Sequence, residues 1–197
     1  VYVYTQILKK LFPETPVIIG GLESSLRRIS HYDYWQNKIK PSILFDTNAD
    51  LLVYGMGEKP LKEIIRLIKK GVPIKNMNSI PQTAYLTPKE NVPKNKLWED
   101  LQLSDFEECA KDKQIQFKNF RLFEIETNKM YSKRIIQNVQ DKSVVVNPPY
   151  PPMAYGELDE SFEYPYMRAP HPRYKKRGPV PAFEMIKFSI NSHRGCF

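Results

Sequence analysis

The chain has 197 residues, and its 41% hydrophobic and 12% aromatic content is enough for a folded core, which excludes wholesale disorder. A formal net charge of +8 allows an anionic partner such as RNA. No apolar run approaches the ~20 residues that a membrane span requires, and two distant cysteines form no disulfide framework, so we expect a cytoplasmic protein with no membrane partner.

The N-terminal residues predict a first helix, strand and helix. Residues 1–12 place apolar side chains at the spacing of an amphipathic helix that Pro13 ends. Residues 17–19 form a short β-branched run, typical of a buried parallel strand, that ends at Gly20-Gly21. Residues 22–29 then predict a short helix.

A second cycle of the same kind follows. Residues 42–45 predict a strand or strand-like segment, and residues 50–54 a stronger strand that runs into Gly55-Met56-Gly57-Glu58. A helix is expected over residues 60–70, with Gly71 at the position after its end. Its expected buried stripe is Leu61, Ile64, Ile65 and Ile68. Repeated strand, glycine turn and helix units predict an α/β domain with a parallel sheet.

The rest of the chain is less regular. Residues 84–86 suggest one more strand, and residues 104–138 predict a charged helical region that begins with a capping box at Ser104 and Glu107. Residues 147–181 hold 9 of the 17 prolines, which predicts a long extended connection.

Four glycines are candidate cofactor-binding residues. Gly20, Gly21, Gly55 and Gly57 follow expected strands, and the carboxyl edge of a parallel sheet is where ligands bind. The pattern fits a phosphate or cofactor cradle. By spacing alone a pair of tight turns that require positive φ is the favoured interpretation, because neither stretch is a complete nucleotide-binding motif.

Three other groups of residues are candidates for chemistry. A polar and aromatic run after the first glycine turn suits a site wall or an interface, or else a packed loop with its polar tips hydrogen-bonded. Its members are Glu23, Arg27, Arg28, His31, Tyr32, Asp33, Tyr34 and Trp35. Cys109 has no ligand-spaced partner and is expected to be a small buried residue. A basic segment between prolines could meet a phosphate backbone or form a solvated loop. It contains Arg168, His171, Arg173, Lys175, Lys176 and Arg177.

Cys196 is the candidate metal ligand. Residues 186–190 predict a strand that leads into Gly195-Cys196, and a barrel enzyme presents active-site ligands at the ends of such strands. One cysteine cannot hold an iron–sulfur cluster. Because the chain also begins at Val1 inside an apolar run, we expect it to be an internal piece of a longer protein.

Several motifs together resemble one family. The stretch from Asn191 to Phe197 resembles the entry to the Cys-x3-Cys-x2-Cys loop of radical S-adenosylmethionine (radical SAM) enzymes. Upstream motifs resemble the YgiQ-type members of that group, and the run from Ile18 to Trp35 is the most specific. The others are Glu126-Thr127-Asn128, Pro148-Pro149, Pro165-Tyr166-x-Arg168, His171-Pro172 and the stretch from Pro181 to Ile186.

The resemblance implies a fold and cofactors. Residues 1–75 look like the second half of a cobalamin-binding-type Rossmann domain, although the usual Gly-Glu-Gly-Glu reads Gly-Met-Gly-Glu at Gly55. Cobalamin itself is not supported, because the Asp-x-His-x-x-Gly signature is absent from the sequence. In the family, three cysteines hold a 4Fe–4S cluster that cleaves S-adenosylmethionine to a 5′-deoxyadenosyl radical. Of those parts only Cys196 carries over, so the fragment alone is expected to be inactive.

We therefore expect a partial Rossmann-like layer over residues 1–95, a helical insertion over 96–140 and a proline-rich connection over 141–181. Residues 182–197 would begin a radical SAM barrel, whose remainder is the expected partner, with an unknown substrate. The alternative is a Rossmann-like binding module that recognises RNA or another anionic ligand and has no catalysis.

Overall fold

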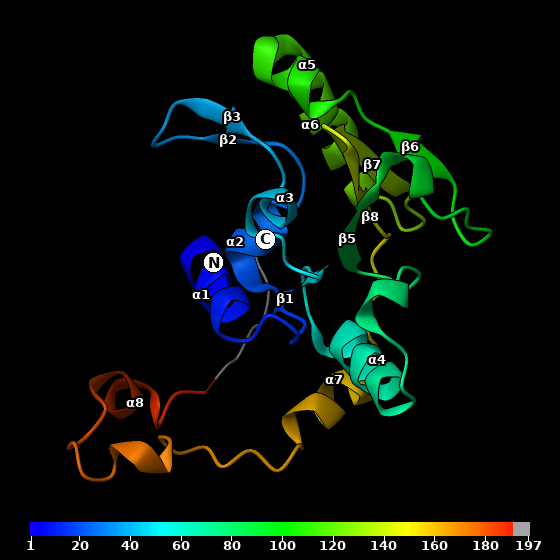
Figure 1. Ribbon diagram of the computed structural model, residues 1–197. Helices are drawn as coiled ribbons and strands as arrows, with labels where there is room; N and C mark the ends of the chain where they lie inside the picture. Colours follow the sequence, from blue (N-terminus) through cyan, green and yellow to red (C-terminus); the bar gives the residue numbers. More distant parts are fainter. Residues whose placement is uncertain (191–197) are drawn as a thin grey trace. The chain divides into compact units, whose positions relative to one another are not determined.

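The computed structural model describes residues 1–190. It contains two compact units, Val1–Met153 and a second that begins at Ala154. The first unit is built on a six-stranded sheet in the order β1-β4-β5-β8-β7-β6, with a separate two-stranded ribbon of β2 and β3 (Figure 1). Among the described residues, no helix has both the length and the apolar character needed to cross a bilayer.

The elements of the first unit are as follows, in chain order. The N-terminal half contains α1 (Tyr2–Leu11), β1 (Ile18–Ile19), α2 (Gly21–Leu26), β2 (His31–Asp33), β3 (Lys38–Lys40), α3 (Ile43–Thr47), β4 (Leu51–Val53), α4 (Glu58–Lys69) and η1 (Ile74–Asn76). The second half contains β5 (Thr83–Pro88), η2 (Lys89–Asn91), β6 (Asp100–Gln102), α5 (Phe106–Lys111), α6 (Lys113–Thr127), β7 (Arg134–Val139) and β8 (Lys142–Val146). The helices and strands expected near residues 1–29, 50–70 and 84–86 are thereby confirmed.

The sheet is mixed rather than parallel throughout. Parallel pairing holds for β1 with β4 and for β6 with β7, whereas β4–β5, β5–β8 and β7–β8 are antiparallel. The expectation of a parallel sheet is wrong for these three pairs. Strands β7 and β8 are joined by only two residues, and so short a connection permits only an antiparallel pair.

The core lies on both faces of this sheet. Along β4, Leu52 belongs to one buried cluster, and its neighbours Leu51 and Val53 belong to the other. The same alternation occurs along β8, as the two-residue period of a strand requires. Because both faces are covered, β4 and the Val144–Val146 part of β8 are apolar at consecutive positions and do not alternate with polar residues.

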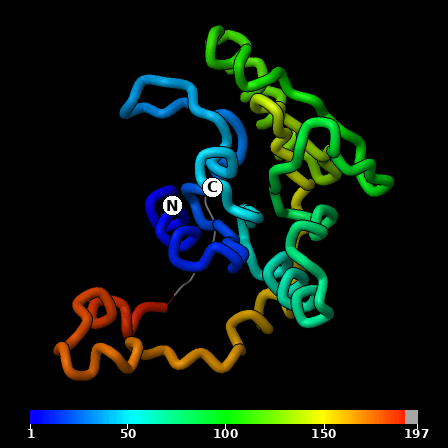
Figure 2. The backbone as a smooth tube through the Cα atoms, in the orientation of Figure 1, coloured from blue at the N-terminus to red at the C-terminus, as the bar shows by residue number. Residues whose placement is uncertain are grey.

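The segment at residues 42–45 is helical, so the expected strand is wrong. The hydroxyl of Ser42 accepts a hydrogen bond from the Leu44 amide at 3.2 Å, which caps α3. Ile43 and Leu44 are buried in the core. Helix α1 lies beside α3, where the Gln6 side chain donates to the Thr47 carbonyl at 3.2 Å (Figure 2). A short apolar run of this kind does not distinguish a buried strand from a buried helix.

Helix α4 forms where expected but faces the sheet with different residues. Ile64 is buried and Leu67 packs beside it, whereas the other members of the expected stripe are exposed. The exposed fractions are 42% for Leu61, 52% for Ile65 and 48% for Ile68. The buried stripe therefore runs through Pro60, Ile64 and Leu67, also at helical spacing.

The region 104–138 is helical only in its first part. Helix α5 ends at Lys111 and α6 at Thr127, and β7 begins at Arg134. The capping box is one residue later than expected, at Asp105 and Glu108. Strands β6, β7 and β8 pair within the same sheet as β1, so residues 96–146 contribute to the main sheet as well as helices.

The second unit contains α7 (Tyr155–Phe162), η3 (Pro172–Tyr174) and α8 (Pro181–Ile186). The proline-rich range is therefore interrupted by helix. The strand expected over residues 186–190 is wrong, because Ile186 ends α8 and residues 187–190 form no strand. Pro181 suits the first turn of a helix, and no described strand lies beside this segment to supply ladder hydrogen bonds.

Candidate functional site

The two glycine turns lie at one edge of the sheet. Gly20 follows β1 and Gly55 follows β4, and these strands are parallel neighbours. The Gly55 amide donates to the Ser25 hydroxyl of α2 at 3.1 Å. A Cβ atom on Gly20 would lie 3.1 Å from the Val53 carbonyl oxygen. The predicted position of these residues at the carboxyl ends of strands is thereby confirmed, and the structure shows that the two strands are adjacent.

The backbone itself accounts for three of these four glycines. Gly21 and Gly55 have φ values of +81° and +64°, which residues with side chains rarely adopt. Gly57 precedes the first residue of α4, where a Cβ would lie 3.4 Å from Leu61 and Val53 side-chain atoms. Positive φ accounts for Gly21 and Gly55, and the close Val53 carbonyl accounts for Gly20, whereas Gly57 has φ −80° and room for a Cβ. A role of the four glycines in binding a cofactor stays a prediction.

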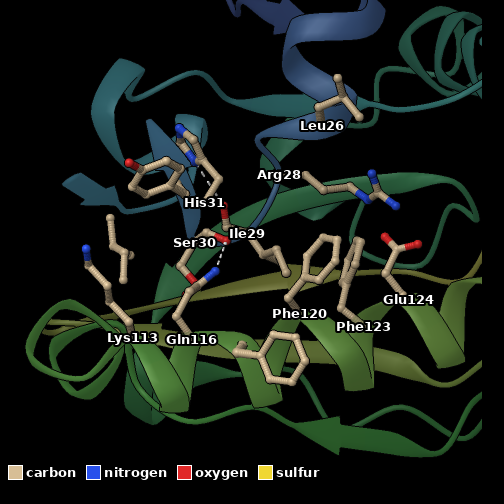
Figure 3. Close-up of a pocket in the computed structure, with 13 residues that line it drawn as sticks. Leu26, Arg28, Ile29, Ser30, His31, Lys113, Gln116, Phe120, Phe123 and Glu124 are labelled. Carbon is tan, nitrogen blue, oxygen red and sulfur yellow. Dashed lines mark hydrogen bonds between the residues drawn. The ribbon is translucent and has the colours of Figure 1, made fainter. Parts of the chain in front are cut away.

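A pocket of about 630 Å³ lies between the segment after α2 and helix α6 (Figure 3). Its volume is in the range of small-molecule sites. Its lining residues are Leu26, Arg28, Ile29, Ser30, His31, Tyr32, Ile39, Lys113, Gln116, Phe117, Phe120, Phe123 and Glu124. Three phenylalanines of α6 form one apolar wall, to which Leu26, Ile29 and Ile39 add, and the other seven lining residues carry polar side chains. This is the arrangement typical of a binding pocket.

A buried amide network fixes the base of the pocket. The Ser30 amide donates to Gln137 Oε1 at 2.8 Å, and Gln137 Nε2 donates to the Ser30 hydroxyl at 2.8 Å. The same hydroxyl donates to Gln116 Oε1 at 2.7 Å, and Gln116 Nε2 donates to the Ser30 carbonyl at 3.0 Å. Every polar group of Ser30 is therefore satisfied, and the segment is held to both β7 and α6.

Arg28 is held between two aromatic rings. Its Cζ atom lies 4.5 Å from the ring centroids of both Tyr54 and Phe123. Its Nη1 donates to the Ser25 carbonyl. Among the described residues Arg28 forms no ion pair, and its Nε is buried without a hydrogen-bond partner. Burial lowers the pKa of Arg28, whereas Tyr54 and Glu124 favour its charge.

His31 lies at the far side of the same segment. Its Nδ1 is 3.3 Å from the Ile29 carbonyl, which favours the tautomer with a proton on Nδ1. Its Nε2 is buried without a partner in the described structure. Burial is the main cause that lowers the pKa of His31, so the ring is neutral near pH 7.

The remaining members of the polar and aromatic run lie elsewhere. Tyr34 and Trp35 are 77% and 88% exposed between β2 and β3, with ring centroids 5.7 Å apart. The Asp33 carboxylate accepts from the Gln36 amide at 2.9 Å and closes that turn. Glu23 pairs with Arg27 at 3.1 Å on α2. Only Arg28, His31 and Tyr32 of this run line the pocket.

The opposite wall of the pocket was missed. The lining residues of α6 are Lys113, Gln116, Phe117, Phe120, Phe123 and Glu124. Five of these follow the i, i+3, i+4, i+7 and i+11 spacing of one helix face, counted from Lys113. The signal was therefore present in the sequence, as an aromatic stripe on a helix that was expected to be an insertion.

Cys109 is buried, as expected. Its Sγ accepts from Asn119 Nδ2 at 3.0 Å, and burial raises the pKa of the thiol. In the described part of the chain, no three His, Cys, Asp or Glu side chains are grouped so that they could hold a metal ion. These residues therefore do not fit an iron–sulfur cluster. Cys196, the predicted ligand, lies outside the described residues.

Comparison with known proteins identifies the family of this chain. Residues 1–189 match the family model described as "Radical SAM N-terminal". The chain belongs to this family, so the expected resemblance is confirmed.

The relatives are UPF0313 proteins. Those of Porphyromonas gingivalis and Bacteroides thetaiotaomicron are each 53% identical over 99% of this chain, which covers 30% and 33% of their lengths. A UPF0313 protein of Geobacter sulfurreducens is 40% identical over 99% of this chain and 31% of the relative. The chain thus spans about a third of the length of these relatives. No solved structure matches it.

Proposed function

We propose that the whole protein is a radical SAM enzyme of which this chain is the N-terminal domain. The observation that carries the proposal is the family match over residues 1–189. It implies a 4Fe–4S cluster and S-adenosylmethionine as cofactors of the whole protein, with a substrate that the family does not specify. The cytoplasm is the proposed compartment, since iron–sulfur chemistry of this kind requires reducing conditions.

The described residues would contribute a ligand-binding pocket to the enzyme and would not ligate the iron–sulfur cluster. Cys109 is enclosed by its neighbours, and we propose that Cys196 ligates the cluster together with cysteines outside this chain. The apolar pocket against α6 is then the feature with which the domain can bind a ligand.

The experiment compares two cysteine variants of the full-length protein after anaerobic reconstitution. Cys196→Ala is expected to abolish the 4Fe–4S absorbance and the formation of 5′-deoxyadenosine from S-adenosylmethionine. Cys109→Ala is the matched control and should keep both, because its thiol is buried among protein groups. A full cluster in the Cys196 variant, or a lost cluster in a folded Cys109 variant, would contradict the assignment. Residues 1–197 expressed alone should bind no stoichiometric cluster, since two separate thiols fall short of the usual ligand set.

A second proposal is that the basic segment of the second unit binds RNA or another polyanion. The observation that supports this proposal is that the basic side chains of the segment are all exposed at the surface. They are Arg168, Arg173, Lys175, Lys176 and Arg177. Binding of this kind weakens steeply with salt. Titration of single-stranded RNA should show salt-dependent binding that the double variant Lys175→Ala with Lys176→Ala reduces. The control double variant Lys69→Ala with Lys70→Ala, at the end of α4, should bind as the native protein does. Equal binding by both double variants would reject the segment as the site.

A further inference from the structure

We propose that the pocket between residues 26–32 and α6 binds a small anionic molecule with a flat apolar body, its carboxylate or phosphate meeting Arg28. The inference goes beyond the radical SAM assignment and does not depend on it, because the pocket is built entirely from described residues of the first unit.

The apolar wall is accessible to a ligand. Phe117 and Phe120 are 60% and 52% exposed although they line a cavity of about 630 Å³. Figure 3 shows Phe120 and Phe123 rising from α6 toward the segment that carries Arg28. Large aromatic side chains left open to water at a concave surface favour an apolar or aromatic ligand, because its body would remove their surface from solvent.

The charge of Arg28 defines the other end of the ligand. A largely buried guanidinium is costly unless an opposite charge compensates it. The rings of Tyr54 and Phe123 provide part of that compensation. No carboxylate lies within ion-pair distance among the described residues.

The neighbouring charges leave room for an anion. Glu124 interacts with Arg28 through its charge, yet Glu124 is exposed to water and forms no ion pair with the guanidinium. Lys113 adds a second positive charge to the pocket lining. With two cationic side chains against one carboxylate and a neutral His31, the lining carries net positive charge. A carboxylate or phosphate on the ligand would pair with Arg28 through charge-assisted hydrogen bonds.

The test uses two fluorescent probes that share an aromatic body. One is 8-anilinonaphthalene-1-sulfonate, which carries an anionic group, and the other is the uncharged N-phenyl-1-naphthylamine. In the full-length protein we expect saturable binding of one sulfonate probe per chain, about tenfold tighter than binding of the neutral probe, as one charge-assisted contact allows. Benzoate and phenyl phosphate as competitors then distinguish a carboxylate from a phosphate ligand.

Variants separate the two ends of the site. Arg28→Met should weaken the sulfonate probe about tenfold and leave the neutral probe unchanged, and Arg28→Lys should retain part of the preference. Phe120→Ser, at an exposed position that the fold tolerates, should weaken both probes. Arg121→Met, an exposed cation of the same helix outside the pocket, is the control and should change neither. Equal affinity for the two probes, no saturable binding, or an unchanged preference in a folded Arg28→Met protein would overturn the proposal.

Discussion

Gln137 and Ser30, which are 107 positions apart in the sequence, are joined by two buried hydrogen bonds of 2.8 Å each. Gln137 is 0% exposed on β7, and Ser30 is 2% exposed just before β2. Because the Gln137 amide serves both the backbone and the hydroxyl of Ser30, it sets the distance between the sheet and the segment that carries Arg28. The pocket therefore depends on a residue that does not line it.

Gln137→Met is expected to lower the free energy of unfolding by about 2–4 kcal/mol, because the buried Ser30 amide loses its acceptor. Urea unfolding measures the loss, and hydrogen exchange should rise locally over residues 28–32. Gln114→Met, at an exposed position of α6, is the control and should leave the unfolding midpoint unchanged. Similar midpoints for the two variants would show that the amide network contributes little.

The ion pair of Arg134 with Asp100 is the second test. Arg134 is 1% exposed, and its Nε and Nη2 donate to the two oxygens of Asp100 at 2.7 and 2.8 Å. Asp100→Asn leaves a buried guanidinium without its counter-charge, so we expect the free energy of unfolding to fall by about 3 kcal/mol. This is the low end of the range for broken buried ion pairs, because Asp100 is partly exposed. Thermal or urea unfolding checks the value.

A matched control for this pair is available one residue away. Glu99 pairs with Lys133 at 2.8 Å, but its side chain is 80% exposed. Glu99→Gln is therefore expected to leave the unfolding midpoint unchanged, since exposed ion pairs are screened by water and salt. If both variants lost the same stability, burial of Arg134 would not be the cause.

The turn after β4 gives the third prediction. Gly55 has φ +64°, and an added Cβ would lie 3.3 Å from the Gln82 side chain. Gly55→Ala should cost about 1–2 kcal/mol, because a residue with a Cβ is strained in the left-handed region. Gly57→Ala in the same turn, where φ is −80°, should cost less than about 1 kcal/mol. The urea midpoints of the two variants test this prediction. A larger loss of stability in Gly57→Ala than in Gly55→Ala would contradict the conformational explanation.

The parts of the fold that the sequence predicted are those with complete local signals. Strands β1 and β4 are apolar runs followed by Gly20 and Gly55, and α4 is followed by Gly71 with φ +77°. The β7–β8 hairpin lacks such a signal. Its turn starts at Gln140 with φ +55°, a conformation for which glycine or asparagine would be typical. The residue types at this turn, Gln140 and Asp141, therefore did not predict a hairpin.

The pocket was only half predictable for a different reason. The run from Arg28 to Tyr32 is unusual enough in composition to be recognised as a site wall or interface. Its opposite wall comes from α6, more than eighty positions later. Which face of α6 meets this run is decided by tertiary contacts, such as the pairing of Ser30 with Gln116. Neither segment carries that information alone.

The last prediction concerns acid stability and His31. Burial lowers the pKa of His31 in the folded protein below its ordinary value of 6.5. At a pH between the pKa of the folded protein and 6.5, the unfolded chain therefore binds a proton more readily than the folded protein does. The free energy of unfolding should therefore fall as the pH drops from 7.5 to 5.5. Arg27 and Lys40 act in the same direction as burial, whereas Asp33 opposes it.

His31→Asn removes the titrating ring and keeps a donor near the Nδ1 position, which is 3.3 Å from the Ile29 carbonyl in the native protein. Urea midpoints measured from pH 7.5 to 5.5 should decline less steeply in this variant than in the native protein. His171→Asn, at an exposed position of the second unit, is the control and should keep the native slope. Since the unpaired Nε2 of His31 is buried, protonation must either open this segment or remain unfavourable, and both reduce stability in acid. Parallel pH profiles for the native protein and His31→Asn would show that the ring is hydrated in solution and that its burial has no energetic consequence.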